Sequence, residues 1–307
     1  MDTRFLESFV SVVEQGSIAE AARRLNLTPA AVAQRIHALE KEIGARLLLR
    51  HGRTVKATEA GAAILSRARM FVSEARDLKS IAATDRPVGI LRLGALQSVL
   101  SGILPGVLTS LADKYPNIEV SIIRGVSGAE LYQKVLDGTI DAAVMAQPPF
   151  ATPKSCQWQG LRDEPLIVLA PALVSSRDPH AILTSTPFIR LDRNTWAGRL
   201  ADGYLRKAGL RPRERFELDS LEVIAVLVDR GLGTSLVPDW APPWPEGLSL
   251  KKLPLPKNQF TRRIGVLWSR ASVRLRLVRI FVEQAVTEVA TTRHRGPRPR
   301  QARTREP

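Results

Sequence analysis

Apolar residues near the N-terminus recur at the spacing of an α-helix. In the stretch LTPAAVAQRIHALEKEIG they are separated by 4, 3 and 4 residues, at Val32, Ile36, Leu39 and Ile43. This periodicity predicts one buried helix stripe. Thr28-Pro29 favours a helix start, because threonine can cap free N–H groups and proline suits the first turn. Gly44 favours the helix end.

A second amphipathic segment, SIAEAARRL, precedes this helix. Only Asn26 and Leu27 separate it from Thr28, and Ser17 followed by Glu20 is a capping-box pattern. A further apolar face upstream is formed by Phe5, Phe9, Val12 and Val13. Short helices joined this tightly predict a helix-turn-helix.

Small and polar residues lie opposite the apolar stripe of the predicted helix. Ala30 and Ala33 leave room for entry into a major groove, and Gln34 can reach base edges. The helix residues expected to face DNA are Thr28, Pro29, Ala30, Ala31, Gln34, Arg35, His37 and Lys41. A solvated polar face on a small helical bundle explains the same spacing equally well.

The following stretch, ARLLLRHGRTVKATEAG, has two short apolar runs around a His-Gly-Arg turn. It contains no acidic residue between Arg46 and Lys56. This pattern predicts a basic β-hairpin, whose Arg50, Arg53 and Lys56 are expected to contact phosphates. The hairpin favours the DNA-binding interpretation of the neighbouring helix.

Residues 2–61 resemble the winged helix-turn-helix of LysR-type transcriptional regulators. The match runs in register through FLESFVSVVEQGSIAEAARRLNLTPAAVAQRIHALEKEIGARLLLR and continues with Arg53, Val55, Thr58 and Gly61. Ala33 stands where the family usually has a serine, Leu48 where it has an aromatic residue and Ala57 where it has a leucine. The resemblance implies a DNA-binding domain over residues 1–61. The missing serine prevents transfer of an operator preference.

The segment from Thr58 to Ala83 contains no proline and repeats apolar residues at a period of 3.5. The repeating positions are Ile64, Ala68, Phe71, Ala75, Leu78 and Ala82. This predicts a linker helix over residues 58–83, roughly 39 Å long at a rise of 1.5 Å per residue, with a coiled-coil seam. The alternative is an amphipathic helix packed on its own domain. The family uses this element to dimerise, so the resemblance implies a homodimer or homotetramer.

Beyond a short hinge, TDRPVG, strand-like runs alternate with amphipathic helices. GILRLGA, NIEVSIIRG and IDAAVMA form one such set, and a second runs from PLIVLAP to GTSLVP. RRIGVLW and a helix over Ser272–Ala290 close the chain. The alternation predicts α/β architecture with a parallel sheet. Two such halves over residues 88–290 resemble the two-lobed fold of type 2 periplasmic binding proteins, which is the LysR effector domain.

Four strand-to-helix joints are candidate parts of an effector site. Ligands of open α/β sheets lie at strand carboxyl ends, beside helix starts whose N–H groups attract anions. The residues concerned are Gln97, Ser98, Ser127, Thr195, Trp196, Asp219 and Ser220. Trp196 can stack on a planar ligand, while Asp219 favours an amino group. Ser and Thr are also ordinary helix caps. The family's matching positions line its effector cleft, and we expect a small anionic or amino-acid-like effector.

Charge and composition narrow the function. The net charge of +15 suits a polyanionic partner, but residues 249–307 alone carry 15 Lys and Arg against 3 acidic residues. Basicity therefore does not locate the DNA site, and the basic tail over residues 293–307 is expected to be disordered. A single cysteine, no signal-peptide pattern and no membrane-spanning apolar run favour a cytoplasmic protein.

Enzyme motifs are weak in this sequence. GLGTSL lacks the third glycine of a dinucleotide loop and precedes a strand. The four histidines are scattered, and Cys156 has no companion at a metal-binding spacing. We therefore expect no catalytic residues, metal or cofactor. The expected function is sequence-specific DNA-binding transcriptional regulation, controlled by an effector bound between the two lobes. A solute-binding component of transport and an enzyme with a regulatory DNA-binding domain are the alternatives.

Overall fold

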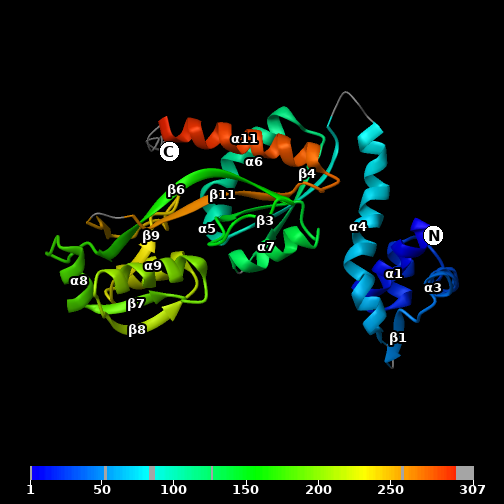
Figure 1. Cartoon of the computed structure of the whole chain (residues 1–307), viewed down its shortest axis with the longest axis horizontal. Helices are drawn as coiled ribbons and strands as arrows, with labels where there is room; N and C mark the ends of the chain where they lie inside the picture. The colour runs from blue at the N-terminus through cyan, green and yellow to red at the C-terminus, as the bar shows by residue number, and fades with distance from the viewer. Residues whose placement is uncertain (1, 52–53, 83–86, 126, 257–258, 295–307) are drawn as a thin grey trace, which may run out of the picture. The chain divides into compact units, whose positions relative to one another are not determined.

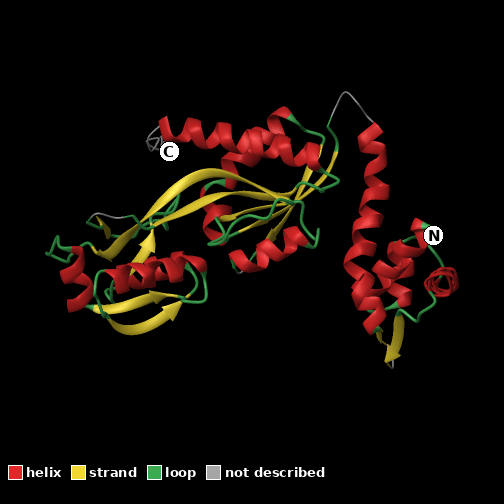
Figure 2. Ribbon diagram, in the orientation of Figure 1, coloured by secondary structure: helices red, strands yellow, loops and turns green. Residues whose placement is uncertain are grey.

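The computed structural model describes residues 2–51, 54–82, 87–125, 127–256 and 259–294. The chain forms two compact units that divide near residue 90 (Figures 1 and 2). We call them the N-terminal unit and the C-terminal unit. Residues 84–86 of the predicted hinge and residues 295–307 of the predicted basic tail lie outside the described residues.

The N-terminal unit consists of four helices and a β-hairpin among the described residues. The elements are α1 (Thr3–Gln15), α2 (Ile18–Arg24), α3 (Pro29–Ile43), β1 (Leu48–His51), β2 (Thr54–Ala57) and α4 (Glu59–Ala82). Their shared core includes Phe9, Val12, Val32, Leu39 and Leu47, all fully buried. The apolar spacing of the sequence therefore predicts the helices correctly.

Local hydrogen bonds explain where these helices begin and end. The Thr28 hydroxyl accepts the Ala31 N–H at 3.2 Å, and the Gly44 N–H donates to the Glu40 carbonyl with Gly44 at φ 75°. Ser17 likewise accepts the Glu20 N–H at 3.5 Å. The carboxylate of Glu20 pairs with Arg23 along the exposed helix surface, so the cap is simpler than the capping box predicted.

Helix α4 uses part of its apolar stripe inside its own unit. Ala68 is only 3% exposed and belongs to the core that α4 shares with α1, together with Val72 and the partly buried Ile64. The prediction that the whole stripe faces a partner is therefore wrong at Ala68, because the stripe of Leu65, Ala68 and Val72 covers α1. Phe71 lies outside that contact and is 53% exposed. The side chains of Leu78 and Ala82 lie outside the described residues.

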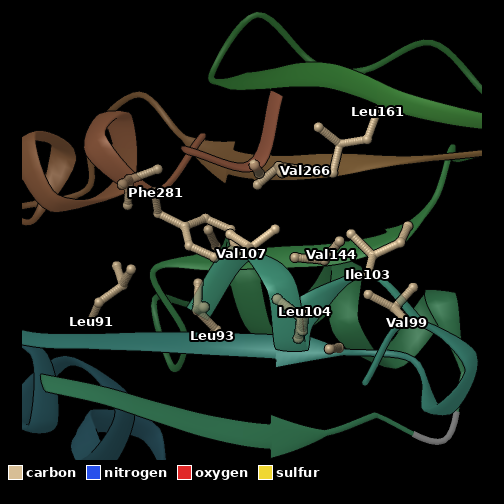
Figure 3. Packing of buried hydrophobic residues seen from close by; sticks show 14 of the residues in the cluster. Leu91, Leu93, Val99, Ile103, Leu104, Val107, Val144, Leu161, Val266 and Phe281 are labelled. Atoms are coloured by element: carbon tan, nitrogen blue, oxygen red, sulfur yellow. The ribbon is translucent and has the colours of Figure 1, made fainter. Parts of the chain in front are cut away.

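The first lobe of the C-terminal unit is built around parallel strands. It contains β3 (Gly89–Ala95), α5 (Gln97–Gly102), α6 (Leu104–Lys114), β4 (Ile118–Arg124), α7 (Gly128–Leu136), β5 (Ala142–Ala146) and α11 (Leu275–His294). β3 pairs in parallel with β5, and residues such as Leu93, Val107, Val144 and Phe281 form the core (Figure 3). The stretch between β3 and β4 forms two helices instead of one, because the chain breaks at Ile103, two residues before Pro105.

Two long antiparallel strands run from the first lobe to the second. These are β6 (Cys156–Pro171) and β11 (Thr261–Ser269), in a sheet ordered β10-β6-β11-β5-β3-β4. The start of β6 pairs with β11, and its end pairs with β9 (Ser235–Pro238) and β10 (Leu250–Pro254). The sequence predicted only the apolar end of β6, because the half-exposed stretch before it has no apolar run.

The second lobe contains α8 (Pro179–Ser185), β7 (Pro187–Leu191), α9 (Trp196–Lys207), β8 (Arg213–Leu218) and α10 (Leu221–Asp229). β7 and β8 pair in parallel. The sequence pattern missed α8 and β10, which are short and lack a clear apolar period. His180 is half-buried and its Nε2 lies 2.7 Å from the Tyr204 hydroxyl, which joins α8 to α9.

Candidate functional site

One face of α3 is largely exposed to solvent. Val32, Ile36 and Leu39 are buried on the opposite side. Of the residues predicted to meet DNA, Ala31 and Arg35 are half-buried, and the exposed ones are Thr28, Pro29, Ala30, Gln34, His37 and Lys41. An α-helix with such a face can enter the major groove and present its side chains to base edges.

The β-hairpin, or wing, is attached to α3 by a carboxylate. One oxygen of Glu40 accepts the N–H groups of Leu47 at 2.8 Å and Leu48 at 3.2 Å. β1 and β2 pair antiparallel, and Lys56 on β2 is exposed. The Arg50 side chain and the whole of Arg53 lie outside the described residues. Glu40 therefore fixes the base of the wing relative to the helix.

The start of α4 is fitted closely to the same wing. The Thr58 hydroxyl donates to the Arg46 carbonyl at 2.7 Å and accepts the Gly61 N–H at 2.9 Å. A Cβ at Gly61 would lie 2.1 Å from the Leu47 carbonyl oxygen. Any side chain at this position would force the wing away from α4, which gives a physical reason for the Thr58 and Gly61 spacing in the sequence.

A cavity of about 140 Å³ in the C-terminal unit is lined by all seven residues predicted at the four strand-to-helix joints. Gln97, Ser98 and Ser127 come from the first lobe, whereas Thr195, Trp196, Asp219 and Ser220 come from the second. The joints converge because both lobes turn the carboxyl ends of their parallel strands toward one another.

Three of the cavity hydroxyls serve as helix caps. Thr195 Oγ1 accepts the Gly198 N–H at 2.9 Å and donates to the Asp192 carbonyl at 2.7 Å. Ser127 and Ser220 accept N–H groups at 3.2 and 3.3 Å. Ser98 differs, because it is inside the first turn of α5 and accepts a hydrogen bond from Arg262 at 3.3 Å. Capping therefore accounts for three hydroxyls and not for Ser98.

Sequence reasoning missed three charged residues of this cavity: Arg124, Glu222 and Arg262. Arg262, on β11, is 7% exposed and donates from Nε to Glu164 Oε2 at 2.7 Å. Glu222 contacts Ser101 across the lobes. The sequence did carry a signal for Arg262. In the strand RRIGVLW, buried and exposed positions alternate at the start, and Arg262 falls on a buried position next to the exposed Arg263. No comparable signal marked Glu222.

The Trp196 side chain, from the second lobe, packs against residues of the first lobe and lines the cavity. A Cβ at Gly128 would lie 2.8 Å from a carbon of the indole ring, so the ring lies on the backbone at the start of α7. Phe150 meets Trp196 edge-on with ring centroids 6.0 Å apart, and Tyr132 meets Phe150 at 5.1 Å. The size of Trp196 therefore spaces the lobes, in addition to any contact with a ligand.

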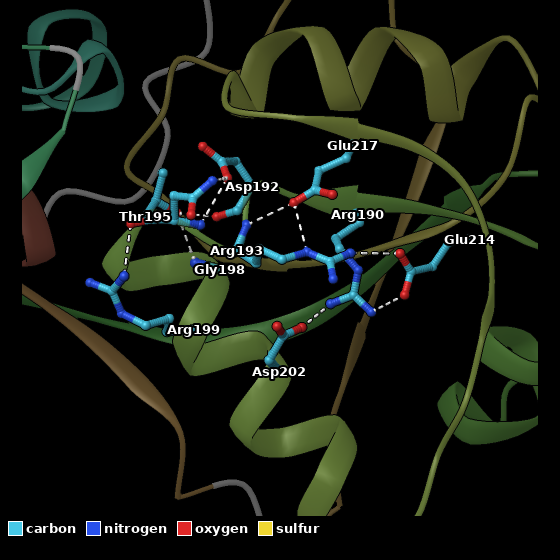
Figure 4. Close-up of polar contacts among 10 residues, drawn as sticks. Arg190, Asp192, Arg193, Thr195, Gly198, Arg199, Asp202, Glu214 and Glu217 are labelled. Carbon is cyan, nitrogen blue, oxygen red and sulfur yellow. Dashed lines mark hydrogen bonds and ion pairs between the residues drawn. The ribbon is translucent and has the colours of Figure 1, made fainter.

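An ion-pair network holds the turn that precedes Trp196 (Figure 4). Arg190 bonds to Asp202 and Glu214, and Arg193 bonds to Glu214 at 2.8 Å and Glu217 at 3.0 Å. The Arg190 hydrogen bond lowers the pKa of Glu214. The backbone N–H of Arg193, followed by its side chain, lowers the pKa of Glu217. These bonds join β7, β8 and α9 and fix the start of α9.

Metal and membrane sites find no support in the part of the chain that the structure describes. Nowhere among these residues do three or more His, Cys, Asp or Glu side chains gather as metal ligands would. The described helices include none with the length and apolar character needed to cross a bilayer.

Comparison with known proteins covers both units. Residues 3–62 match the model of the bacterial regulatory helix-turn-helix protein, lysR family, and residues 84–290 match the LysR substrate binding domain. The HTH-type transcriptional regulator CzcR of Bacillus cereus is 30% identical over 242 residues, covering 78% of this chain and 81% of that protein. The regulator AlsR of Bacillus subtilis is 28% identical over 249 residues, covering 78% and 82%.

Solved structures share the fold. Full-length CbnR in complex with its target DNA has a TM-score of 0.65 at 23% identity, covering 93% of this chain and 100% of CbnR. A full-length OxyR variant of Pseudomonas aeruginosa has a TM-score of 0.71 at 21% identity, covering 93% and 94%. With an exposed polar face on α3, a cavity between two lobes and family matches over both units, the chain belongs to the LysR family of DNA-binding transcription regulators.

Proposed function

We propose that this regulator reads its operator with the α3 face and the wing, and that a small effector in the interlobe cavity controls it. The observation that carries the proposal is the convergence of four separate strand ends, from both lobes, on one cavity. Such a ligand contacts both lobes and therefore favours one arrangement of them over others. Since the partner is genomic DNA, we infer a cytoplasmic location.

Sequence recognition is assigned to Gln34, with Arg35, His37 and Lys41 beside it on α3. Lys56 and the wing arginines at 50 and 53 are assigned to phosphates. An exposed glutamine can make paired hydrogen bonds to adenine in the major groove, whereas a lysine contact to a phosphate carries no sequence information. The exposure of Gln34 and Lys56 supports these roles.

The DNA assignment is tested by fluorescence anisotropy with double-stranded DNA from upstream of the gene. Gln34→Ala is expected to weaken operator binding by about 1–3 kcal/mol and to relax sequence preference. Lys56→Ala is expected to weaken binding to all sequences and make the salt dependence shallower. Gln133→Ala and Lys154→Ala, at exposed positions of the C-terminal unit, serve as matched controls. Wild-type binding by the Gln34 and Lys56 double variant would refute the assignment.

The effector is assigned to the cavity as a small anionic or amino-acid-like metabolite. Ser98, buried to 6% exposure beside Arg262, supports a polar ligand because its hydroxyl is not needed for a helix cap. We infer binding and not catalysis, since the other hydroxyls are committed to caps. A thermal-shift and calorimetric screen of metabolites tests this assignment. A confirmed effector that bound Ser98→Ala and Thr195→Ala with unchanged affinity would place the site elsewhere.

Self-association is assigned to the exposed side of α4. Phe71 supports this because a 53% exposed aromatic side chain in the middle of a helix is a favourable contact for a second copy. A homodimer would present two α3 helices to one duplex, and a tetramer would require further contacts. Phe71→Asp is expected to reduce the mass measured by light scattering and to lower operator affinity. Unchanged mass together with unchanged affinity would exclude Phe71 from the interface.

A further inference from the structure

The buried arginine of the cavity is already neutralised. Arg262 approaches Glu164 Oε2 at 2.7 Å through Nε and at 2.5 Å through Nη2, with side-chain exposures of 6% and 2%. Glu164 also accepts the Ala241 N–H at 3.2 Å. A buried ion pair of this kind is held together because removal of either charge leaves the other unpaired. Arg262 can donate hydrogen bonds to a ligand, but its own charge is paired with Glu164, so the other arginine of the cavity lining is Arg124, which is exposed.

Two carboxylates of the same cavity are not neutralised. Glu222, half-buried on α10, receives long hydrogen bonds from the Ser101 hydroxyl at 3.5 Å and the Ser220 hydroxyl at 3.3 Å. Asp219 lies three residues earlier, just before the start of α10. Within the described ranges of the chain, no Lys or Arg forms an ion pair with either carboxylate. Hydroxyl contacts therefore leave the Glu222 carboxylate without an ion-pair partner among the described residues.

We propose that the effector bears a protonated amine, which Glu222 and Asp219 bind, and that its acceptor end meets Ser98 and Arg262. This inference rests on the proposed effector role of the cavity and specifies its ligand. An ammonium group donates three hydrogen bonds, which suits the two carboxylates. A ligand with carboxylates alone would instead add negative charge beside Glu222 and Asp219.

The volume of the cavity and the side chains that line it narrow the chemical class of the effector. A cavity of about 140 Å³ holds a small metabolite, so an amino acid or a compact amine fits. A divalent metal is disfavoured because the described residues bring no third His, Cys, Asp or Glu to these two carboxylates. Because Glu222 on α10 also meets Ser101 on α5, an ammonium bound there would add a charged contact at the junction of the lobes.

The experiment uses the full-length protein and matched probes. The twenty L-amino acids and a set of primary amines are screened by thermal shift and titration calorimetry. Each hit is compared with its deaminated acid and its decarboxylated amine; for leucine these are 4-methylpentanoate and 3-methylbutylamine. We expect at least one amine-bearing probe to bind, and its deaminated acid to bind at least tenfold more weakly. Failure of every amine-bearing probe to bind overturns the inference.

Substitutions then locate the amine. Glu222→Gln keeps the shape and the hydroxyl contacts but removes the charge, and is expected to weaken the hit at least tenfold. Asp219→Asn should weaken it less, because Asp219 is more exposed. Glu119→Gln, an exposed carboxylate on β4 outside the cavity, should leave affinity unchanged. Unfolding and operator binding without probe verify that each variant is folded.

The outcomes separate this inference from the proposed function. If Ser98→Ala weakens the hit but Glu222→Gln binds it equally or more tightly, the cavity is the effector site and the amine assignment is wrong. If neither substitution changes the affinity of the hit, both assignments are wrong, because the ligand binds outside the cavity.

Discussion

The two units build their functional surfaces in different ways. In the N-terminal unit, the surface proposed to meet DNA comes from one continuous stretch, α3 and the wing, joined by Glu40. In the C-terminal unit, the cavity takes residues from positions 96 to 262, on elements of both lobes, and Glu164 joins Arg262 to the backbone at Ala241. A surface carried by adjacent elements of one unit does not depend on how two lobes are arranged. A cavity between lobes depends on their arrangement, which a ligand can change.

Removal of Glu164 is the most damaging of the changes considered. Glu164→Ala leaves Arg262 buried without its carboxylate, which is expected to lower the free energy of unfolding of the C-terminal unit by about 3–5 kcal/mol. Thermal denaturation of the full chain measures the loss. The double variant Glu164→Leu/Arg262→Met should recover most of the stability but not probe binding. A Glu164→Ala protein as stable as wild type would show that the pair is not buried as described.

Removal of Glu40 tests the corresponding carboxylate of the N-terminal unit. Glu40→Ala withdraws the acceptor of two wing N–H groups, an expected cost of about 1–3 kcal/mol. Operator affinity should fall because the wing loses its attachment to α3, while binding of an effector probe should not change. Glu59→Ala, at an exposed position on α4, is the control. Equal effects of the two substitutions on operator affinity would contradict the role of Glu40.

Two threonine caps provide a matched pair, one in each unit. Thr28 caps α3 and Thr195 caps α9 with the same hydroxyl-to-N–H hydrogen bond. Each Thr→Ala change is expected to cost about 0.5–2 kcal/mol, and Thr→Ser should restore most of it. Thr28→Ala should reduce operator affinity alone, and Thr195→Ala should reduce probe affinity alone. Operator affinity is measured by anisotropy and probe affinity by calorimetry. A loss of probe affinity in Thr28→Ala, or of operator affinity in Thr195→Ala, would mean that the sites are not confined to separate units.

Acid should affect the C-terminal unit through the network at α9. Glu214 and Glu217 have lowered pKa values in the folded chain, so they stabilise the fold above the ordinary glutamate pKa of about 4.3. That stability is lost as the pH falls from this value through the folded-state pKa values. The effect is small because both side chains are more than a third exposed. Arg193→Gln should flatten the dependence of melting temperature on pH. The same dependence in the variant and the wild type would contradict a role of this network in acid stability.

The sequence predicted what depends on neighbours along the chain. The period of Val32, Ile36 and Leu39 and the caps at Thr28 and Gly44 gave α3 directly, because a helix is stabilised by contacts three and four residues apart. The four joints of the cavity were also found, since each follows a strand and opens a helix. Their convergence on one cavity is consistent with the fold that the family resemblance implied.

Other features depend on contacts between distant segments. The strand alternation in RRIGVLW marks Arg262 as buried but not as a cavity residue, and Glu222 has no local pattern at all, because both positions follow from the pairing of β11 with β6 and from the meeting of α10 with α5. Ser98 and Ser127 look alike in the sequence, but only Ser127 caps a helix. The apolar stripe of α4 was compatible with packing on a partner helix and with packing on its own unit. In the structure Ala68 packs against α1, a contact that the sequence pattern alone does not reveal.

The return of the chain through β11 and α11 determines the order in which the C-terminal unit can be completed during synthesis. The first lobe begins near residue 90, but its core includes Val266, Val278 and Phe281. The second lobe draws its core from Leu166 to Phe260. On the ribosome, the second lobe can therefore fold while the first still lacks a central strand and a covering helix. Premature termination just before Thr261 would leave the apolar face of the first lobe uncovered and exposed to aggregation.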